Sequence, residues 1–181
     1  SSLRSVEADL KVIVGQDTGE EGKTEIFWHF SPTLAAQSRY VDTLLSTSIP
    51  TSNDSNPSTD HKEIVMADIS PAQWQAMIRL VTNPLAFKSM DVEEALELAP
   101  LYDQYEFLIG FQMCDEVLST AFKENKDENL VYLVLAIALA NDINLKKTFH
   151  WGRIWLKRIF SVNMVSKFKL SASQIKRLVP T

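Results

Sequence analysis

The sequence predicts an α+β protein, in which a small β-sheet is flanked by a cluster of α-helices and followed by additional C-terminal helices. Three observations favour this class. Short β-branched runs lie in the first third of the chain, helix start signals follow from residue 70 onward, and strands and helices do not alternate regularly. The 181 residues suffice for one domain with a sizeable core, or for one domain and part of a second.

The expected strands are short runs closed by glycine or polar residues, and they cover residues 9–15, 24–30 and 63–69. The first two suggest a hairpin. Between the second and third strands we expect a helix from Ser31 to about Ser46, because serine suits the N-cap and Pro32 loses no useful donor in the first turn. The polar residues 46–62 predict a long loop after this helix.

The rest of the chain carries repeated helix signals. Ser70, Pro71 and Gln73 have the form of a capping box, so a helix should begin there and end near residues 82–84. Asp91 is expected to cap the next helix in the same way. Four further helices are predicted over residues 106–123, 128–141, 145–162 and 171–179.

No residue pattern predicts catalysis, a cofactor or a metal site. His29, His61 and His150 contain no pair at the i, i+4 spacing of a helical metal site. Cys114 lies among apolar helical positions, so we expect a buried, inert thiol. The five glycines form no phosphate-binding loop. We therefore expect a protein that is not an enzyme.

Nothing in the sequence indicates a membrane or an export signal. The N-terminus lacks a basic segment followed by an apolar run, and the longest apolar run, 130–140, is about half of a bilayer span. That run is expected to form a helix buried on most sides. The single cysteine fits a reducing compartment. We expect a cytoplasmic or nuclear protein with no membrane partner.

The charge is unevenly distributed along the chain. No acidic residue follows Asp142, whereas nine basic residues do, although the whole chain has a net charge of −5. Residues 145–160 interleave cations with aromatic residues, which is typical of a nucleic-acid or anionic-membrane surface. The alternative is a helix that packs Trp151 and Trp155 on the preceding helices. We favour this alternative because exposed tryptophans are costly, and we do not expect a nucleic-acid partner.

Four segments, taken in order, carry a resemblance to a known family: the strand from Asp9 to Gly15, "LAAQSRYV" (34–41), "EIVMADISPAQWQAMIRLVTN" (63–83), and "LYDQY" (101–105) with Cys114 nine residues later. Together they resemble a BTB/POZ domain over residues 6–122. Residues 127–181 are similar to the start of the helical BACK region that often follows BTB. The resemblance implies two domains with these bounds and a BTB/POZ-like sheet in the first.

The same resemblance implies a function. BTB domains are protein–protein interaction modules that mediate homo-oligomerisation and partner recruitment, so the chain is expected to be a scaffold or adaptor and a homodimer. One alternative is a substrate adaptor for a cullin-type E3 ubiquitin ligase, with a cullin scaffold protein as partner. Another, from the charge pattern, is nucleic-acid binding through the basic C-terminal helices.

Two of the departures of this sequence from the family pattern bear on its partners. Ser31 stands where some dimeric members carry a basic residue that pairs with the strand aspartate, so Asp9 is expected to lack that partner. Cullin-binding members tend to carry a hydrophobic residue followed two positions later by glutamate. Here these positions hold Ile49 and Thr51, which weakens the cullin alternative.

Seven residues are the candidates for a protein interface: Asp9, Leu34, Tyr40, Leu44, Leu45, Ile49 and Tyr105. For each leucine the alternative is an ordinary position in the core. For Asp9 the alternative is a solvated strand start.

Overall fold

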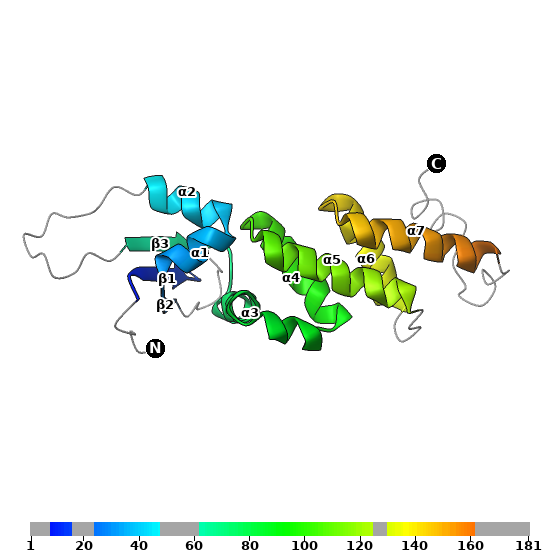
Figure 1. The fold of residues 1–181 in the computed structure, drawn as a ribbon, viewed down its shortest axis with the longest axis horizontal. Helices are drawn as coiled ribbons and strands as arrows, with labels where there is room; N and C mark the ends of the chain where they lie inside the picture. Colours follow the sequence, from blue (N-terminus) through cyan, green and yellow to red (C-terminus); the bar gives the residue numbers. More distant parts are fainter. Residues whose placement is uncertain (1–7, 16–23, 48–61, 125–129, 162–181) are drawn as a thin grey trace, which may run out of the picture. The chain divides into compact units, whose positions relative to one another are not determined.

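The computed structural model describes residues 8–15, 24–47, 62–124 and 130–161, except for the side chains at 84, 86, 130 and 159–161 (Figure 1). These ranges contain three strands and seven α-helices, and strands and helices do not alternate regularly, so the predicted α+β class is confirmed. Four predictions fall wholly or almost entirely outside these residues. They are the turn after the first strand, the polar loop over 46–62, the helix over 171–179 and the interface residue Ile49.

The chain divides into two compact units. The first holds the described residues up to Pro84 together with Gln104–Ile109, and the second holds Leu85–Asp103 and the described residues from Gly110 onward. The domains expected from the family resemblance, 6–122 and 127–181, stay a prediction.

The sheet of the first unit has the strand order β2-β1-β3. Strands β1 (Leu10–Val14) and β2 (Glu25–His29) are antiparallel, as the expected hairpin requires, whereas β3 (Lys62–Met66) runs parallel to β1. A parallel pair needs a long crossover connection. The helices α1 (Ser31–Gln37) and α2 (Arg39–Thr47) lie in that connection and pack against each other, and α2 contacts β3.

One face of the sheet forms the core of the first unit. Leu10, Val12 and Val14 are fully buried, and they lie beside Ile64 and Met66 of β3. Because successive side chains of a strand point to opposite faces, the intervening residues lie on the other face of the sheet. We call that other face the outer face.

The single helix predicted from Ser31 to Ser46 is wrong, because Ser38 interrupts it with an extended backbone (φ −131°, ψ 115°). The buried Ser38 hydroxyl donates to the carbonyl oxygen of Tyr105 at 2.6 Å and accepts from the N–H of Val41 at 3.0 Å. A serine that bonds backbone groups in this way caps a new helix rather than continuing the old one. The break therefore depends on Tyr105, which lies far away in the sequence.

The prediction that Ser31 caps the helix is also wrong. Phe30 occupies the N-cap position and makes no side-chain cap, while Ser31 is the first helical residue. The predicted capping box of α3 (Pro71–Thr82) is confirmed, because Ser70 and Gln73 exchange bonds of 3.2 and 3.0 Å.

Four of the predicted helix segments lie wholly or mostly in the second unit. They are α4 (Val92–Gln104), α5 (Leu108–Lys123), α6 (Leu130–Asp142) and α7 (Lys146–Ser161), and a short 3-10 turn, η1 (Pro84–Ser89), precedes them. The Asp91 carboxylate accepts from the N–H of Glu94 at 2.8 Å, so the predicted cap of α4 is confirmed. The last residue of α4, Gln104, and the first two of α5, Leu108 and Ile109, belong to the first unit.

Helix α6 is less buried than its sequence predicts. It buries Leu133, Ile137 and two alanines but leaves Val131 and Leu135 exposed, so it has an apolar face outside the core. No helix among the described residues combines the length and hydropathy that a membrane span requires.

Candidate protein interface

Asp9 is held by the first residue of α1. Its carboxylate accepts from the Ser31 hydroxyl at 2.6 Å and from the Ser31 N–H at 2.7 Å. Burial alone would raise the pKa of Asp9, but these bonds and the charge of Lys62 lower the pKa below its ordinary value. Asp9 is therefore not a solvated strand start: Ser31 supplies two donors at the position where some dimeric members of the resembled family carry a basic partner.

This contact fixes the chain between β2 and α1. Phe30 precedes Ser31 in an extended conformation (φ −89°, ψ 111°), and its side chain is 52% exposed. Side chains along an extended chain alternate between the two faces of a sheet. Ile26, Trp28 and Phe30 are two residues apart, so all three lie on the outer face.

An apolar row crosses the outer face. Ile13 of β1 lies opposite Ile26 of β2 on one side and Val65 of β3 on the other. Ile26 is 44% exposed and Val65 is 43% exposed, so the two ends of the row remain open to solvent while Ile13 is nearly covered. Large apolar side chains grouped on one sheet face are typical of a contact surface.

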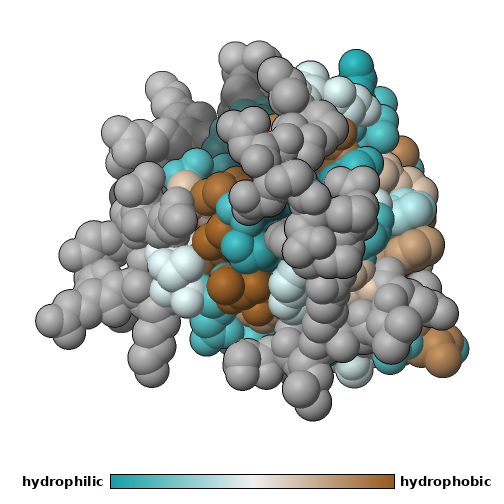
Figure 2. Space-filling view, turned by 90° about the vertical axis from the view of Figure 1, so that its left-hand side faces the viewer, coloured by the Kyte–Doolittle hydropathy of each residue, from teal (hydrophilic) through white to brown (hydrophobic). Residues whose placement is uncertain are grey.

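The neighbouring row is partly charged. Lys11 lies between Trp28 and Glu63, and its ammonium group forms an ion pair of 2.6 Å with the Glu63 carboxylate. The outer face thus combines exposed apolar residues with one balanced pair of charges. Figure 2 shows another side of the molecule, where hydrophobic and hydrophilic residues lie side by side at the centre of the view.

Two of the proposed interface residues form an aromatic pair. The rings of Tyr40 and Tyr105 meet edge to face with centroids 5.5 Å apart. Tyr105 is buried, and its hydroxyl has no hydrogen-bond partner among the described residues. Burial raises the pKa of Tyr105. Tyr40 and Leu44 are partly accessible on α2 and could contact another molecule.

Leu34 and Leu45 belong to the core of the first unit, where they are 1% and 9% exposed. This placement agrees with the alternative that the sequence left open for each leucine. A partner could reach these two side chains only after a rearrangement of α1 or α2. Their role at an interface stays a prediction.

Sequence reasoning did not select Phe30, Ile26 or Val65 as contact residues. The segment "EIFWHF" (25–30) indicated a strand, but its consecutive apolar residues did not indicate which face is covered. Which face is covered depends on α3, where the buried Trp74 donates to His29 at 3.2 Å and so marks the inner face of β2.

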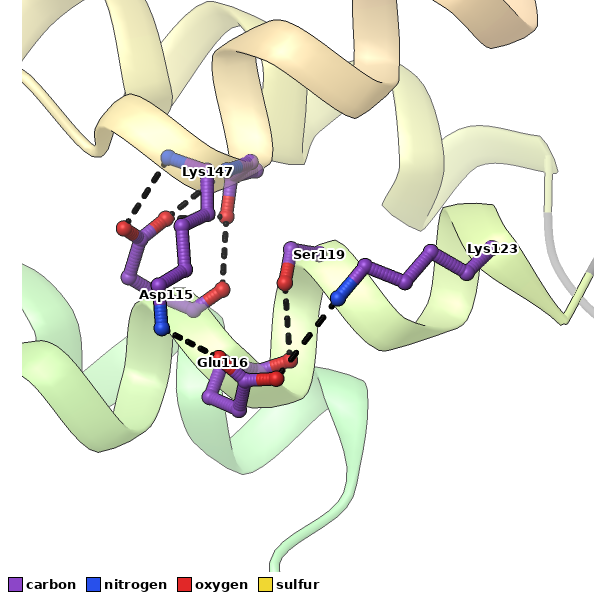
Figure 3. Close-up of polar contacts among 6 residues, drawn as sticks. Asp115, Glu116, Ser119, Lys123 and Lys147 are labelled. Carbon is purple, nitrogen blue, oxygen red and sulfur yellow. Dashed lines mark hydrogen bonds and ion pairs between the residues drawn. The ribbon is translucent and has the colours of Figure 1, made fainter.

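The second unit holds a polar cluster between α5 and α7 (Figure 3). The buried Asp115 carboxylate accepts from the N–H groups of Lys147 and Thr148 at 3.1 and 2.8 Å, and from the Thr148 hydroxyl at 2.7 Å. Glu116 lies between Lys123 and Lys147. Asp115 satisfies free N–H groups at the start of α7, so the cluster is accounted for by helix packing.

The described residues offer no catalytic or metal-binding arrangement. Among them, no three His, Cys, Asp or Glu side chains converge as a metal site. Burial, with Glu94 and Asp115 nearby, raises the pKa of Cys114 to about 12, which keeps the thiol protonated and unreactive near neutral pH.

Comparison with known proteins adds no assignment. No protein-family model matches the chain, and no curated protein matches it either.

Proposed function

We propose that this chain is a protein–protein interaction module that associates with a second copy of itself through the outer face of its sheet. The observation that carries the proposal is the row of Ile26, Ile13 and Val65, which crosses all three strands and is open at both ends. Phe30 extends the apolar surface toward α1. The resemblance to BTB/POZ domains supports self-association as the general role.

A second copy fits this face because the face is complementary to itself. A two-fold symmetric interface uses the same patch on both partners, so it must tolerate its own charges. Lys11 and Glu63 are already paired at 2.6 Å, and they would enter the interface as a neutral unit. The apolar row can then pack against its symmetry-related copy without an unpaired charge.

The size of the face limits the affinity. Three strands of five residues span an area of about 240 Å², from a strand spacing of about 4.8 Å and a rise of about 3.3 Å per residue. One side of a stable interface provides about 800 Å². The sheet face must therefore be joined by Phe30 and neighbouring surface, and we expect a weak dimer.

Light scattering after size exclusion, over loading concentrations from about 1 μM to about 1 mM, tests the proposal. The chain should approach twice 20.5 kDa at the upper end. The double variant Ile26→Glu, Val65→Glu should stay monomeric, because it places unpaired charges in the row. The control Leu108→Glu, Leu135→Glu makes the same change at two exposed apolar residues elsewhere and should still dimerise.

Two results would overturn the proposal: a monomer at every concentration, or a face variant that dimerises as well as the control. Circular dichroism of each variant shows whether it is folded.

The cullin-adaptor alternative rests on the family resemblance alone, because Ile49 and Thr51 lie outside the described residues. Binding of a cullin N-terminal domain to a chain that does not dimerise would favour it.

A further inference from the structure

Two contacts determine which side of α7 faces α5 and α6. Trp155 is buried, and its ring lies edge to face with Phe122 of α5 at a centroid distance of 5.7 Å. Gly152 approaches α6 so closely that a Cβ there would lie 2.6 Å from the Ile137 Cγ1 atom. The opposite side of α7 therefore faces away from α5 and α6.

A stripe of six residues runs along the outward side of α7, spaced three or four residues apart as one helical face requires: Lys146, Phe149, His150, Arg153, Ile154 and Lys157. These residues line a concave site of about 320 Å³. We call this set the cationic stripe. It combines three permanent cations with two large apolar side chains.

The acidic residues that the structure describes do not neutralise the stripe. Glu116 pairs with Lys147 at 2.5 Å and with Lys123 at 3.6 Å, and both of these lysines lie off the stripe. Within the part of the chain that the structure describes, Lys146 and Lys157 form no ion pair, and Arg153 lies over the Phe149 ring at 5.7 Å. The stripe keeps its charge available for another molecule.

We infer that the cationic stripe docks an acidic amphipathic helix of a partner protein. The cations are separated by seven and then four residues, which corresponds to about 10 and about 6 Å along the helix axis. Acidic side chains at helical spacing on a partner match this linear pattern, and apolar side chains between them can cover Phe149 and Ile154.

A nucleic acid fits the stripe less well. Its phosphates would use the cations but leave Ile154 without an apolar partner, and the cations lie on a chain whose net charge is −5. That charge repels a polyanion at long range. An acidic helix presents fewer charges and supplies apolar contacts, so it suits the mixed character of the stripe better. The inference does not depend on self-association through the sheet.

Fluorescence anisotropy with the full chain tests the inference. The probe is a labelled synthetic helical peptide with glutamates on one face and leucines between them, and its control replaces every glutamate with glutamine. A labelled DNA duplex is a second probe. We expect the acidic peptide to bind more tightly than both.

Matched protein variants locate the site. Arg153→Glu with Lys157→Glu should weaken peptide binding by about tenfold or more, since each reversal replaces an attraction with a repulsion. Arg39→Glu with Lys88→Glu changes the total charge equally at exposed positions off the stripe and should leave the affinity within about twofold. The milder Arg153→Gln, Lys157→Gln variant, checked by circular dichroism, replaces the first if the reversal disturbs folding.

Three results would overturn the inference. They are the absence of peptide binding, equal binding of the glutamine control, and tighter binding of the DNA duplex that is lost in the Arg153→Glu, Lys157→Glu variant. The last result would assign the stripe to nucleic acid instead.

Discussion

The contact between His29 and Trp74 makes the stability of this protein depend on pH. The Trp74 indole N–H can only donate, and it points at the Nε2 atom of His29 at 3.2 Å. His29 must therefore keep that nitrogen unprotonated in the folded chain. Burial lowers the pKa of His29 from 6.5 to about 4, in agreement with this geometry.

The sign and size of the effect follow from this depressed pKa. The unfolded chain takes up a proton on His29 below pH 6.5, whereas the folded chain resists protonation down to about pH 4. The stabilisation is complete above pH 6.5 and is lost as the pH falls toward 4. Between pH 7.5 and 5, this one proton lowers the free energy of unfolding by about 2 kcal/mol.

Urea unfolding of the wild type and of His29→Gln at both pH values measures the effect. Glutamine keeps an acceptor for Trp74 but cannot titrate, so the variant should lose about 2 kcal/mol less than the wild type on acidification. His150→Gln removes an exposed histidine and should retain most of the wild-type loss. An identical pH dependence in the wild type and His29→Gln would refute the reasoning.

Two further predictions concern hydrogen-bonded carboxylates. Ser31→Ala removes one donor from Asp9 and should lower the free energy of unfolding, measured in urea, by about 1–2 kcal/mol. The control Ser46→Ala loses only an exposed bond within α2 and should change the free energy of unfolding by less than about 0.5 kcal/mol. Equal effects of the two substitutions would mean that the Asp9 contact is not structural. Asp115→Ala leaves buried donors at the start of α7 without an acceptor, so it should lower the free energy of unfolding by about 3 kcal/mol. Glu116→Ala breaks only exposed ion pairs and should lower it by less than about 1 kcal/mol in the same assay. The Asp115 reasoning fails if the two adjacent substitutions have similar effects.

Local signals in the sequence predicted most of the elements correctly. The strands, the cap at Asp91 and the capping box at Ser70 depend on residues within a few positions of each other. Each was found where it was expected, except that the third strand ends at Met66 and not at residue 69. The helix expected from Ser31 to Ser46 failed because its break at Ser38 is determined by the carbonyl group of Tyr105. No local pattern contains that distant partner.

The candidate interface was harder to predict for the same reason. Hydrophobic residues of α1 and α2 suggested contact with a partner, yet Leu34 and Leu45 are buried within the first unit. Phe30 and Ile26, which sequence reasoning did not select, are exposed. Hydrophobicity alone does not distinguish a core face from an outer face, because both need similar side chains.

The sequence by itself determined the α+β class, most helix starts and the lack of a recognisable catalytic motif, since these depend on periodicity, capping and residue type. Only the tertiary structure decided which sheet face is open and which lysine of α7 pairs with Glu116. The physical reason is that burial and ion pairing are properties of neighbours in space. Lys147 and Lys157 are residues of the same type on the same helix, but of the two only Lys147 lies near Glu116.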